Sequence, residues 1–300
     1  MSYVVAVDVG GTEIKSALVD SDFNVIATIT APTPKSDSTG TETVKAIAAI
    51  VAEFGATQKV EAVGLAVPGA LDELAGTSRW SGNLQWKNLP IRDLLHAEIN
   101  IPVAFGHDVR TAAVAELRSG AAQGARNAIF IPVGTGIAAA LIIDGEIRSA
   151  EGYAGEIGHI DVNGKYPCVC GKTGCLEAAS STLAISKAYE AQSGKTGTTT
   201  EEIYKLVVAG DAVATRVWND ATAAMARACE TLITLLAPEV IVFGGGLSNA
   251  GDTFLNPIQD YLDASLTFQR KPRLEIAHYG AKAGTIGCAM LAFDLVKAGK

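Results

Sequence analysis

The chain has 300 residues, of which 48% are hydrophobic and 19% are charged, and its formal net charge is −8. This composition indicates a compact globular protein, and the length suits two domains. The acidic charge, which no basic run offsets, argues against nucleic acid as a partner. The N-terminus has no basic signal-peptide region and no apolar run approaches the ~18 residues of a membrane span, so we expect a cytoplasmic protein with no membrane partner.

Strand and helix patterns alternate along the first part of the chain. Hydrophobic runs of strand length occur at residues 4–7, 14–19, 23–29, 63–70 and 101–105. Apolar residues at helical spacing predict helices over Thr41–Phe54 and Thr111–Ser119. This alternation is typical of α/β architecture.

A similar order recurs in the second part of the chain, which indicates an internal repeat. A strand pattern at 128–133, the loop G-T-G at 134–136 and an apolar run at 137–143 match the start of the chain, and residues 240–247 resemble 63–70. Further helices are predicted over Glu177–Ser193, Ala212–Leu236, Asn256–Leu266 and Gly284–Ala298. We therefore expect an N-terminal domain over 1–115 and a larger domain of similar construction over 116–286, with a C-terminal helix at 287–300 that packs back on the first.

Three glycine loops follow predicted strands at equivalent places: D-V-G-G-T (8–12), G-T-G (134–136) and G-G-G-L-S (244–248). One such loop is usually only a turn, but three at repeat-related positions favour a bound nucleotide, because glycine lets backbone N–H groups approach phosphates. Neither a P-loop nor the Rossmann fingerprint is present, which disfavours those two nucleotide-binding classes. The expected nucleotide-binding residues are Asp8, Gly10, Gly11, Thr12, Gly134, Thr135, Gly136, Gly245 and Gly246.

Two aspartates follow predicted strands and are candidates for chemistry. Asp8 could hold Mg²⁺ near the phosphates or simply cap the tight turn that follows it. Asp108 is a candidate catalytic base where a strand passes into a helix, although a helix N-cap is the interpretation that spacing alone favours.

A cluster of cysteines predicts a metal site. Cys168, Cys170 and Cys175 lie within eight residues, and His159 precedes them by nine. Three thiolates and one imidazole form the closed four-ligand set of a structural Zn²⁺. A disulfide or a chance cluster is the alternative, but Cys168 and Cys170 are too close to pair comfortably and nothing else marks the chain as secreted.

Taken in order, these motifs resemble those of the ROK family of bacterial sugar kinases and related repressors. The resemblance rests on D-V-G-G-T, G-H-D-V-R-T-A-A-V-A-E, G-T-G, E-I-G-H and C-V-C-G-K-T-G-C-L-E, and it covers the whole chain. It implies a two-domain, actin-like ATPase (ribonuclease H-like) fold with duplicated domains, a homodimer, and an ATP-dependent kinase acting with Mg²⁺ on the 6-hydroxyl of glucose or a related hexose.

The resemblance also assigns roles to individual residues. Asp108 would be the base, and zinc would be held by His159, Cys168, Cys170 and Cys175. The residues expected to contact the sugar are Gly69, Asn83, His107, Asp108, Glu156, His159 and Glu177.

The chain departs from the family pattern next to the base. The family's kinases usually read E-N-D-A-N there, whereas this chain reads G-H-D-V-R, with His107 in place of an asparagine. N-acetylglucosamine or N-acetylmannosamine is therefore an alternative acceptor, and polyphosphate an alternative donor. A sugar-responsive repressor is a further alternative, but such repressors carry a helix-turn-helix domain of ~80 residues ahead of the kinase-like part, and here the first strand pattern starts at once.

Overall fold

The computed structural model describes residues 2–299, which form two compact units. The first unit contains the chain up to Arg118, the segment Ser149–Ala154 and the residues from Lys282 onward, and the second contains Ser119–Arg148 and Gly155–Ala281. The predicted division lies after residue 115, and the returning segment was expected to begin at 287. Ser149–Ala154 falls in the first unit, whereas the predicted division placed it in the second.

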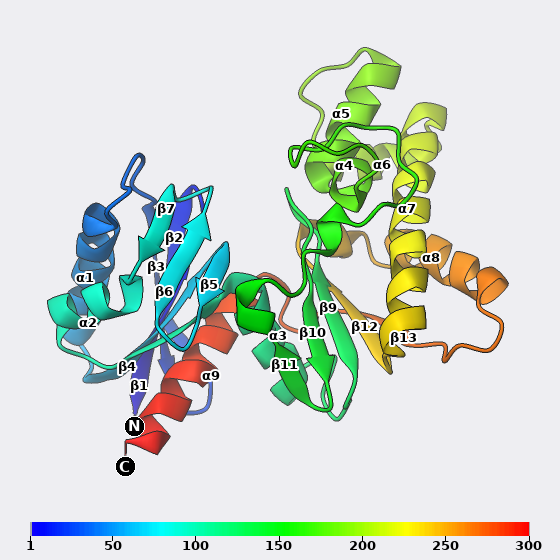
Figure 1. The fold of residues 1–300 in the computed structure, drawn as a ribbon. Helices are drawn as coiled ribbons and strands as arrows, with labels where there is room; N and C mark the ends of the chain where they lie inside the picture. Colours follow the sequence, from blue (N-terminus) through cyan, green and yellow to red (C-terminus); the bar gives the residue numbers. More distant parts are fainter. Residues whose placement is uncertain (1, 300) are drawn as a thin grey trace. The chain divides into compact units, whose positions relative to one another are not determined.

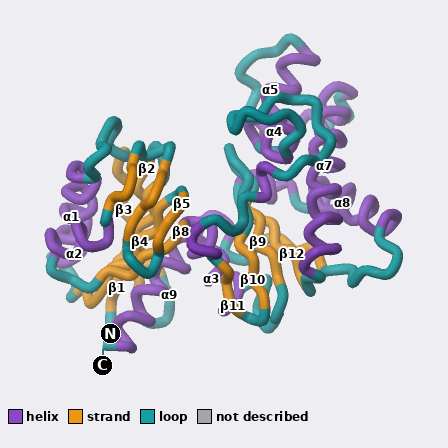
Figure 2. The backbone as a smooth tube through the Cα atoms, viewed as in Figure 1, coloured by secondary structure: helices purple, strands orange, loops and turns teal. Residues whose placement is uncertain are grey.

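Each unit is built on a five-stranded sheet, and the two sheets have the same strand order (Figures 1 and 2). The first runs β3 (Val25–Pro32), β2 (Glu13–Asp20), β1 (Tyr3–Val9), β4 (Val60–Val67), β8 (Val103–His107). The second runs β11 (Glu146–Arg148), β10 (Ala140–Ile143), β9 (Ala128–Pro132), β12 (Val240–Gly244), β13 (Arg273–Ile276). In each sheet the first three strands in this order pair antiparallel, and the last three pair parallel. The predicted α/β class and its duplication are confirmed.

Helices cover both faces of the sheet in the first unit. Along β1, Val5 and Val7 pack with α1 (Thr41–Gly55) and α2 (Ile91–Ile99), whereas Val4 and Ala6 pack with α9 (Ala283–Ala298). The period of two along a strand explains this division of side chains between faces. The final helix is therefore part of the first unit's core.

Two glycines let α9 approach its neighbours closely. A Cβ on Gly64 of β4 would collide with the carbonyl oxygen of Cys288, and one on Gly287 would collide with that of Thr111 in α3 (Asp108–Ser119). A larger residue at position 64 would force α9 away from the sheet, and one at position 287 would force it away from α3.

The second unit packs its helices around one hydrophobic core. The helices are α4 (Leu176–Ser180), α5 (Thr182–Ser193), α6 (Thr200–Val208), α7 (Ala212–Leu236) and α8 (Asp252–Ser265). The long α7 matches its predicted range, and the Asp211 carboxylate caps it by accepting from the N–H groups of Val213 and Ala214. The single helix predicted over Glu177–Ser193 is wrong, because Ser181 is extended and its hydroxyl caps a new helix, α5, by accepting from the N–H of Ala184.

A small antiparallel sheet in the first unit has no counterpart in the prediction. It consists of β5 (Ala70–Asp72), β6 (Thr77–Ser81) and β7 (Trp86–Leu89), paired in that order. Gly152, buried in the first unit, packs against the backbone of Leu71 in β5; a Cβ there would collide with the Leu71 carbonyl. This contact brings Ser149–Ala154 into the first unit.

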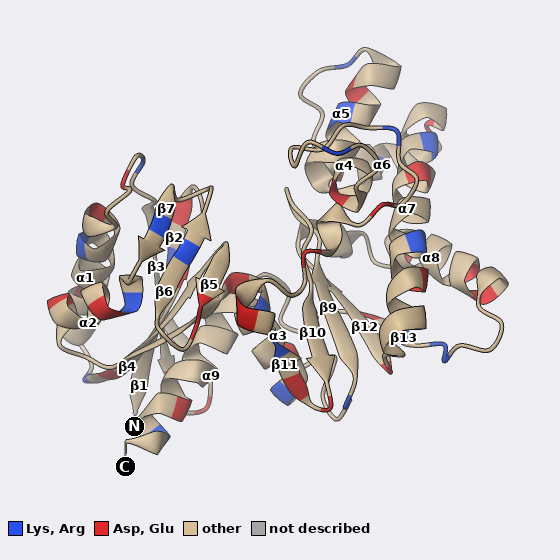
Figure 3. Cartoon of the chain, viewed as in Figure 1, with Lys and Arg blue, Asp and Glu red and all other residues tan. Residues whose placement is uncertain are grey.

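Charged side chains of both signs are interspersed along the elements of each unit (Figure 3). Within residues 2–299, none of the helices combines the length and the apolar character needed to cross a membrane.

Candidate active site and metal centre

The first unit places two carboxylates at one edge of its sheet. Asp8 lies opposite Ala66 of β4, and His107, the residue before Asp108, lies opposite Val67. Because β1, β4 and β8 are parallel, Asp8 and Asp108 meet at their carboxyl ends. Burial and the negative charge of Asp108 raise the pKa of Asp8, Lys15 lowers it, and the net result is a pKa of about 6. Asp8 is thus a partly buried carboxylate that a cation would hold in its ionised form.

Asp108 is held by one of its two carboxylate oxygens. Its Oδ1 accepts from the N–H of Val109 at 2.7 Å and lies 3.0 Å from Nδ1 of His107. Its Oδ2 has no hydrogen-bond partner among residues 2–299, and the side chain is 35% exposed. Asp108 is the first residue of α3, so it contributes to the helix start and also presents a free oxygen.

Glu73, which was not predicted from the sequence, forms hydrogen bonds to residues on both sides of Asp108. It lies in the turn between β5 and β6, and its Oε1 accepts from the backbone N–H of His107 at 3.0 Å and from Nε of Arg110 at 3.1 Å. The Arg110 side chain is 5% exposed, and its Nη2 is buried without a partner among the described residues. The pair therefore connects the small sheet to the residues on both sides of Asp108.

The expected sugar residues of the first unit flank the same loops. A Cβ on Gly11 would lie 3.3 Å from Cβ of Asn83, so Asn83 packs on the D-V-G-G-T loop. Gly69 follows β4 with φ +110°, and a side chain there would collide with the Trp80 carbonyl. Glycine is needed at this position for both reasons.

The second unit gathers the remaining expected sugar residues beside the G-T-G loop. Gly155 and Gly158 let the loop between them, which carries Glu156, pack directly on residues 137–139, where a Cβ on either would collide with a backbone carbonyl. Oε2 of Glu177 accepts from the N–H of Ile137 at 2.9 Å. Glu177 and the E-I-G-H loop are thus fixed to the same short segment.

The predicted G-T-G and G-G-G loops of this unit lie next to each other. Gly245 has φ +76° and packs on the backbone of Val133, next to Gly134. A cavity of about 530 Å³ opens beside them, lined by Gly246 and Leu247 and by Tyr204 and Lys205 of α6. This volume is in the range of small-molecule sites. The α6 wall was not predicted, since its helical pattern carries no motif.

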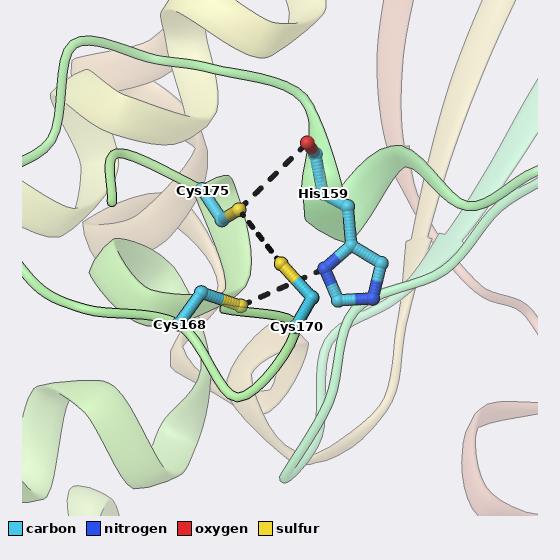
Figure 4. A group of neighbouring side chains, drawn as sticks. All are labelled: His159, Cys168, Cys170 and Cys175. Carbon is cyan, nitrogen blue, oxygen red and sulfur yellow. Dashed lines mark hydrogen bonds between the residues drawn. The ribbon is translucent and has the colours of Figure 1, made fainter. Parts of the chain in front are cut away.

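The cysteine cluster forms a compact group of four ligand atoms (Figure 4). All lie within 4.8 Å of one another; Nδ1 of His159 is 3.6 Å from Sγ of Cys168, and Sγ of Cys170 is 3.6 Å from Sγ of Cys175. Tetrahedral Zn²⁺ with bonds of ≈2.3 Å to sulfur requires neighbouring sulfurs about 3.8 Å apart. The donor set and its spacing therefore fit such an ion.

The thiols differ in acidity when no cation is bound. Burial, with the neighbouring thiols, raises the pKa of Cys175 to about 12, whereas the backbone N–H of Lys172 lowers that of Cys170. A buried thiol that resists ionisation becomes a thiolate when a cation is bound. Figure 4 shows the second ring nitrogen of His159 pointing away from the cluster, so it remains free for another contact.

The predicted site residues thus form one group in each unit. Asp8, Gly10–Thr12, Gly69, Asn83, His107 and Asp108 lie in the first, and the G-T-G and G-G-G loops, Glu156, His159, Glu177 and the cysteines lie in the second.

Comparison with known proteins identifies the family. The model of the ROK family matches residues 4–294. A glucokinase of Halalkalibacterium halodurans is 34% identical over 95% of this chain and 93% of its own length. A ROK family glucokinase of Streptomyces griseus, solved with glucose and AMPPNP, is 29% identical with a TM-score of 0.84 over 98% of this chain and 100% of its own.

A protein of Listeria monocytogenes described as a putative N-acetylmannosamine kinase is 25% identical, with a TM-score of 0.86 over 98% of this chain and 99% of its own. These likenesses confirm the actin-like ATPase fold expected of the duplicated sheets. The chain therefore belongs to the ROK family, and over nearly its whole length it is similar to that family's sugar kinases.

Proposed function

We propose that the protein is an ATP-dependent hexose kinase that phosphorylates the 6-hydroxyl of glucose. The observation that carries the proposal is the asymmetry of Asp108, whose Oδ1 is fixed while Oδ2 is free and the side chain is one-third exposed. A carboxylate held in this way is suited to take a proton from a hydroxyl. The similarity to glucokinases over the full chain supports glucose as the acceptor.

In the proposed reaction, Oδ2 of Asp108 accepts the proton of the sugar 6-hydroxyl. The sugar oxygen forms a bond to the γ-phosphorus of ATP as the bond between that phosphorus and the bridging oxygen breaks, and ADP leaves. Asp8 would hold Mg²⁺, which when bound neutralises charge on the phosphates. The partly buried position of Asp8 and its raised pKa support this role, because a cation relieves the penalty of ionising it.

The second unit supplies the proposed nucleotide site. The backbone of Gly134–Gly136 and of Gly245–Gly246 would face the phosphates, and the cavity beside Gly246 would take the adenosine. Tyr204 and Lys205 line this cavity and offer an aromatic edge and a cation to the nucleotide.

We further propose that the cysteine cluster holds a structural Zn²⁺. The ion would fix the loop that runs from Glu156 to Glu177 and so set the positions of both carboxylates. Glu156, His159 and Glu177 would then accept or donate hydrogen bonds to sugar hydroxyls, with Asn83 and Gly69 as further sugar contacts.

An N-acetylhexosamine is the second candidate acceptor, and His107 favours it. This histidine stands where family kinases carry asparagine, and it is buried against the base, with 9% of its side chain exposed. An imidazole offers one donor and one acceptor from a rigid ring, so it cannot reproduce the hydrogen bonds of an amide.

A coupled assay with ATP or polyphosphate and a panel of glucose, mannose, N-acetylglucosamine and N-acetylmannosamine tests the proposal. Detection with a dehydrogenase specific for glucose 6-phosphate also identifies the position of the new phosphate. Asp108→Asn should lower kcat by roughly 10²–10⁴-fold with glucose binding retained in calorimetry. Asp93→Asn, on the exposed side of α2, is the matched control. Full activity of Asp108→Asn, or no phosphorylated hexose, would contradict the proposal.

A further inference from the structure

The small sheet of the first unit forms one side of an open cavity that none of the roles above uses. Its volume is about 660 Å³, and Trp80 of β6 and Tyr153 of the Ser149–Ala154 segment line it. These two residues are 61% and 63% exposed. Two large aromatic rings exposed in one concavity are uncommon on a protein surface without a ligand.

The backbone holds the indole of Trp80 in place. A Cβ on Gly82 would lie 2.9 Å from the Trp80 ring, so the ring lies directly on this glycine. Gly82 lies nearest to Cη2 and Cζ2 of the ring, and Trp80 as a whole remains 61% exposed. Gly82 precedes Asn83, and therefore the cavity and a proposed sugar contact share one turn of the chain.

Polar groups around the rings form a neutral, preorganised set. Arg79 donates to Asp72 at 2.8 Å, and its Nη1 lies 4.0 Å from Oε2 of Glu151, which is exposed and outside the lining. Thr77 and Asn88 add a hydroxyl and an amide to the lining. Since the one cation and the one anion of the lining neutralise each other, the cavity favours an uncharged ligand that both donates and accepts hydrogen bonds.

We propose that this cavity is a second carbohydrate subsite, in which a pyranose ring stacks its apolar C–H face on Trp80 and Tyr153 and bonds its hydroxyls to Asp72, Arg79 and Asn88. The inference rests on the proposed action on sugars, because that action brings pyranoses to this unit. The ring could belong to a glycosyl extension of the acceptor or to a separate sugar molecule; the chemistry of recognition is the same.

Tryptophan fluorescence can report this cavity specifically. Of the three tryptophans, Trp86 and Trp218 are 2% and 1% exposed, so a surface ligand can change only the emission of Trp80 appreciably. Titration with cellobiose, without nucleotide, should give a saturable change in wild type. Tyr153→Ala should weaken binding roughly two- to ten-fold. Trp80→Ala lacks the reporter, so calorimetry measures its loss of cellobiose binding.

Leu74→Ala is the matched control, because Leu74 is 94% exposed in the adjoining β5–β6 turn and does not line the cavity. It should bind cellobiose like wild type, and thermal denaturation should show all three variants folded. A kinase assay with cellobiose distinguishes the two sources of the ring. If wild type phosphorylates cellobiose and Trp80→Ala does not, the ring belongs to an extended acceptor. If cellobiose binds but is not phosphorylated, the ring belongs to a separate sugar.

The outcomes separate this inference from the proposed function. Unchanged cellobiose affinity in both Trp80→Ala and Tyr153→Ala would overturn the subsite while leaving glucose phosphorylation intact. A saturable response to adenosine and none to sugars would also overturn it. Conversely, cellobiose binding that depends on Trp80, in a protein that phosphorylates no hexose, would support the subsite and refute the kinase proposal alone.

Discussion

Removal of the Glu73 carboxylate should destabilise the first unit strongly, because it leaves a buried cation without its partner. Arg110 is 5% exposed and Glu73 is 28% exposed, so the two ends of the ion pair differ in their access to water. Breaking a buried pair by removing one partner costs about 3–5 kcal/mol. The partial exposure of the site favours the lower value, and we expect Glu73→Ala to lower the free energy of unfolding by about 3 kcal/mol.

The reverse change should be milder. Arg110→Met removes the buried charge and leaves Glu73, which water can still reach, so we expect a loss of about 1 kcal/mol. The double variant should lose about as much stability as Arg110→Met alone, and less than the sum of the two single losses. The reason is that it has no buried cation left without a partner. The loss of stability in Glu73→Gln should lie between those of Arg110→Met and Glu73→Ala, because the amide oxygen can still accept from the N–H of His107.

Urea unfolding followed by tryptophan emission measures these differences. A Trp218→Phe background removes the tryptophan of the second unit, so the signal then comes from Trp80 and Trp86 of the first. This matters because two-domain chains often unfold in more than one step. A loss below about 1 kcal/mol for Glu73→Ala, or a double variant less stable than Glu73→Ala, would refute the reasoning.

Three further predictions concern the metal site, Asp8 and His107. Cys170→Ala should abolish stoichiometric zinc, lowering Tm and glucose affinity together; a zinc-free preparation with wild-type binding would contradict this. In metal-free protein, Asp8 keeps its proton up to about pH 6 when folded but only to about 3.8 when unfolded, so its contribution to stability is full below pH 3.8 and is lost as the pH rises through 6. That loss is roughly 3 kcal/mol, and Asp8→Asn should remove the slope from denaturation curves taken between pH 4 and 7. His107→Asn should change the kcat/KM ratio of glucose to N-acetylglucosamine, and an equal ratio would assign His107 to packing alone.

Local patterns in the sequence were sufficient to predict the repeated central strands and the cluster of His159 with three cysteines, but not the edge strand β13. The ligands of the cluster lie between residues 159 and 175, and the loop that joins them is short enough for spacing to indicate the site. The central strands β1, β4, β9 and β12 have the continuous hydrophobic runs that burial on both faces requires. Likewise, α7 combines a long apolar periodicity with an Asp211 cap, and its range agrees with the prediction.

Features that depend on distant partners were not predicted. Glu73 and Arg110 are separated by 37 residues, and nothing in a turn containing one glutamate indicates a buried arginine elsewhere. The strand β5 has three residues, too few for a periodic pattern. The break at Ser181 depends on a hydroxyl that caps the following helix, which competes with an otherwise continuous helical pattern.

The return of α9 to the first unit has a consequence for the order in which the chain can fold during synthesis. Residues up to Arg118 leave the ribosome early, but the face of β1 and β4 that α9 covers stays bare until the residues after Lys282 emerge. The second unit, synthesised in between, can close its core first. Valine and alanine side chains on that face must therefore avoid other partners for the time needed to translate more than half of the chain.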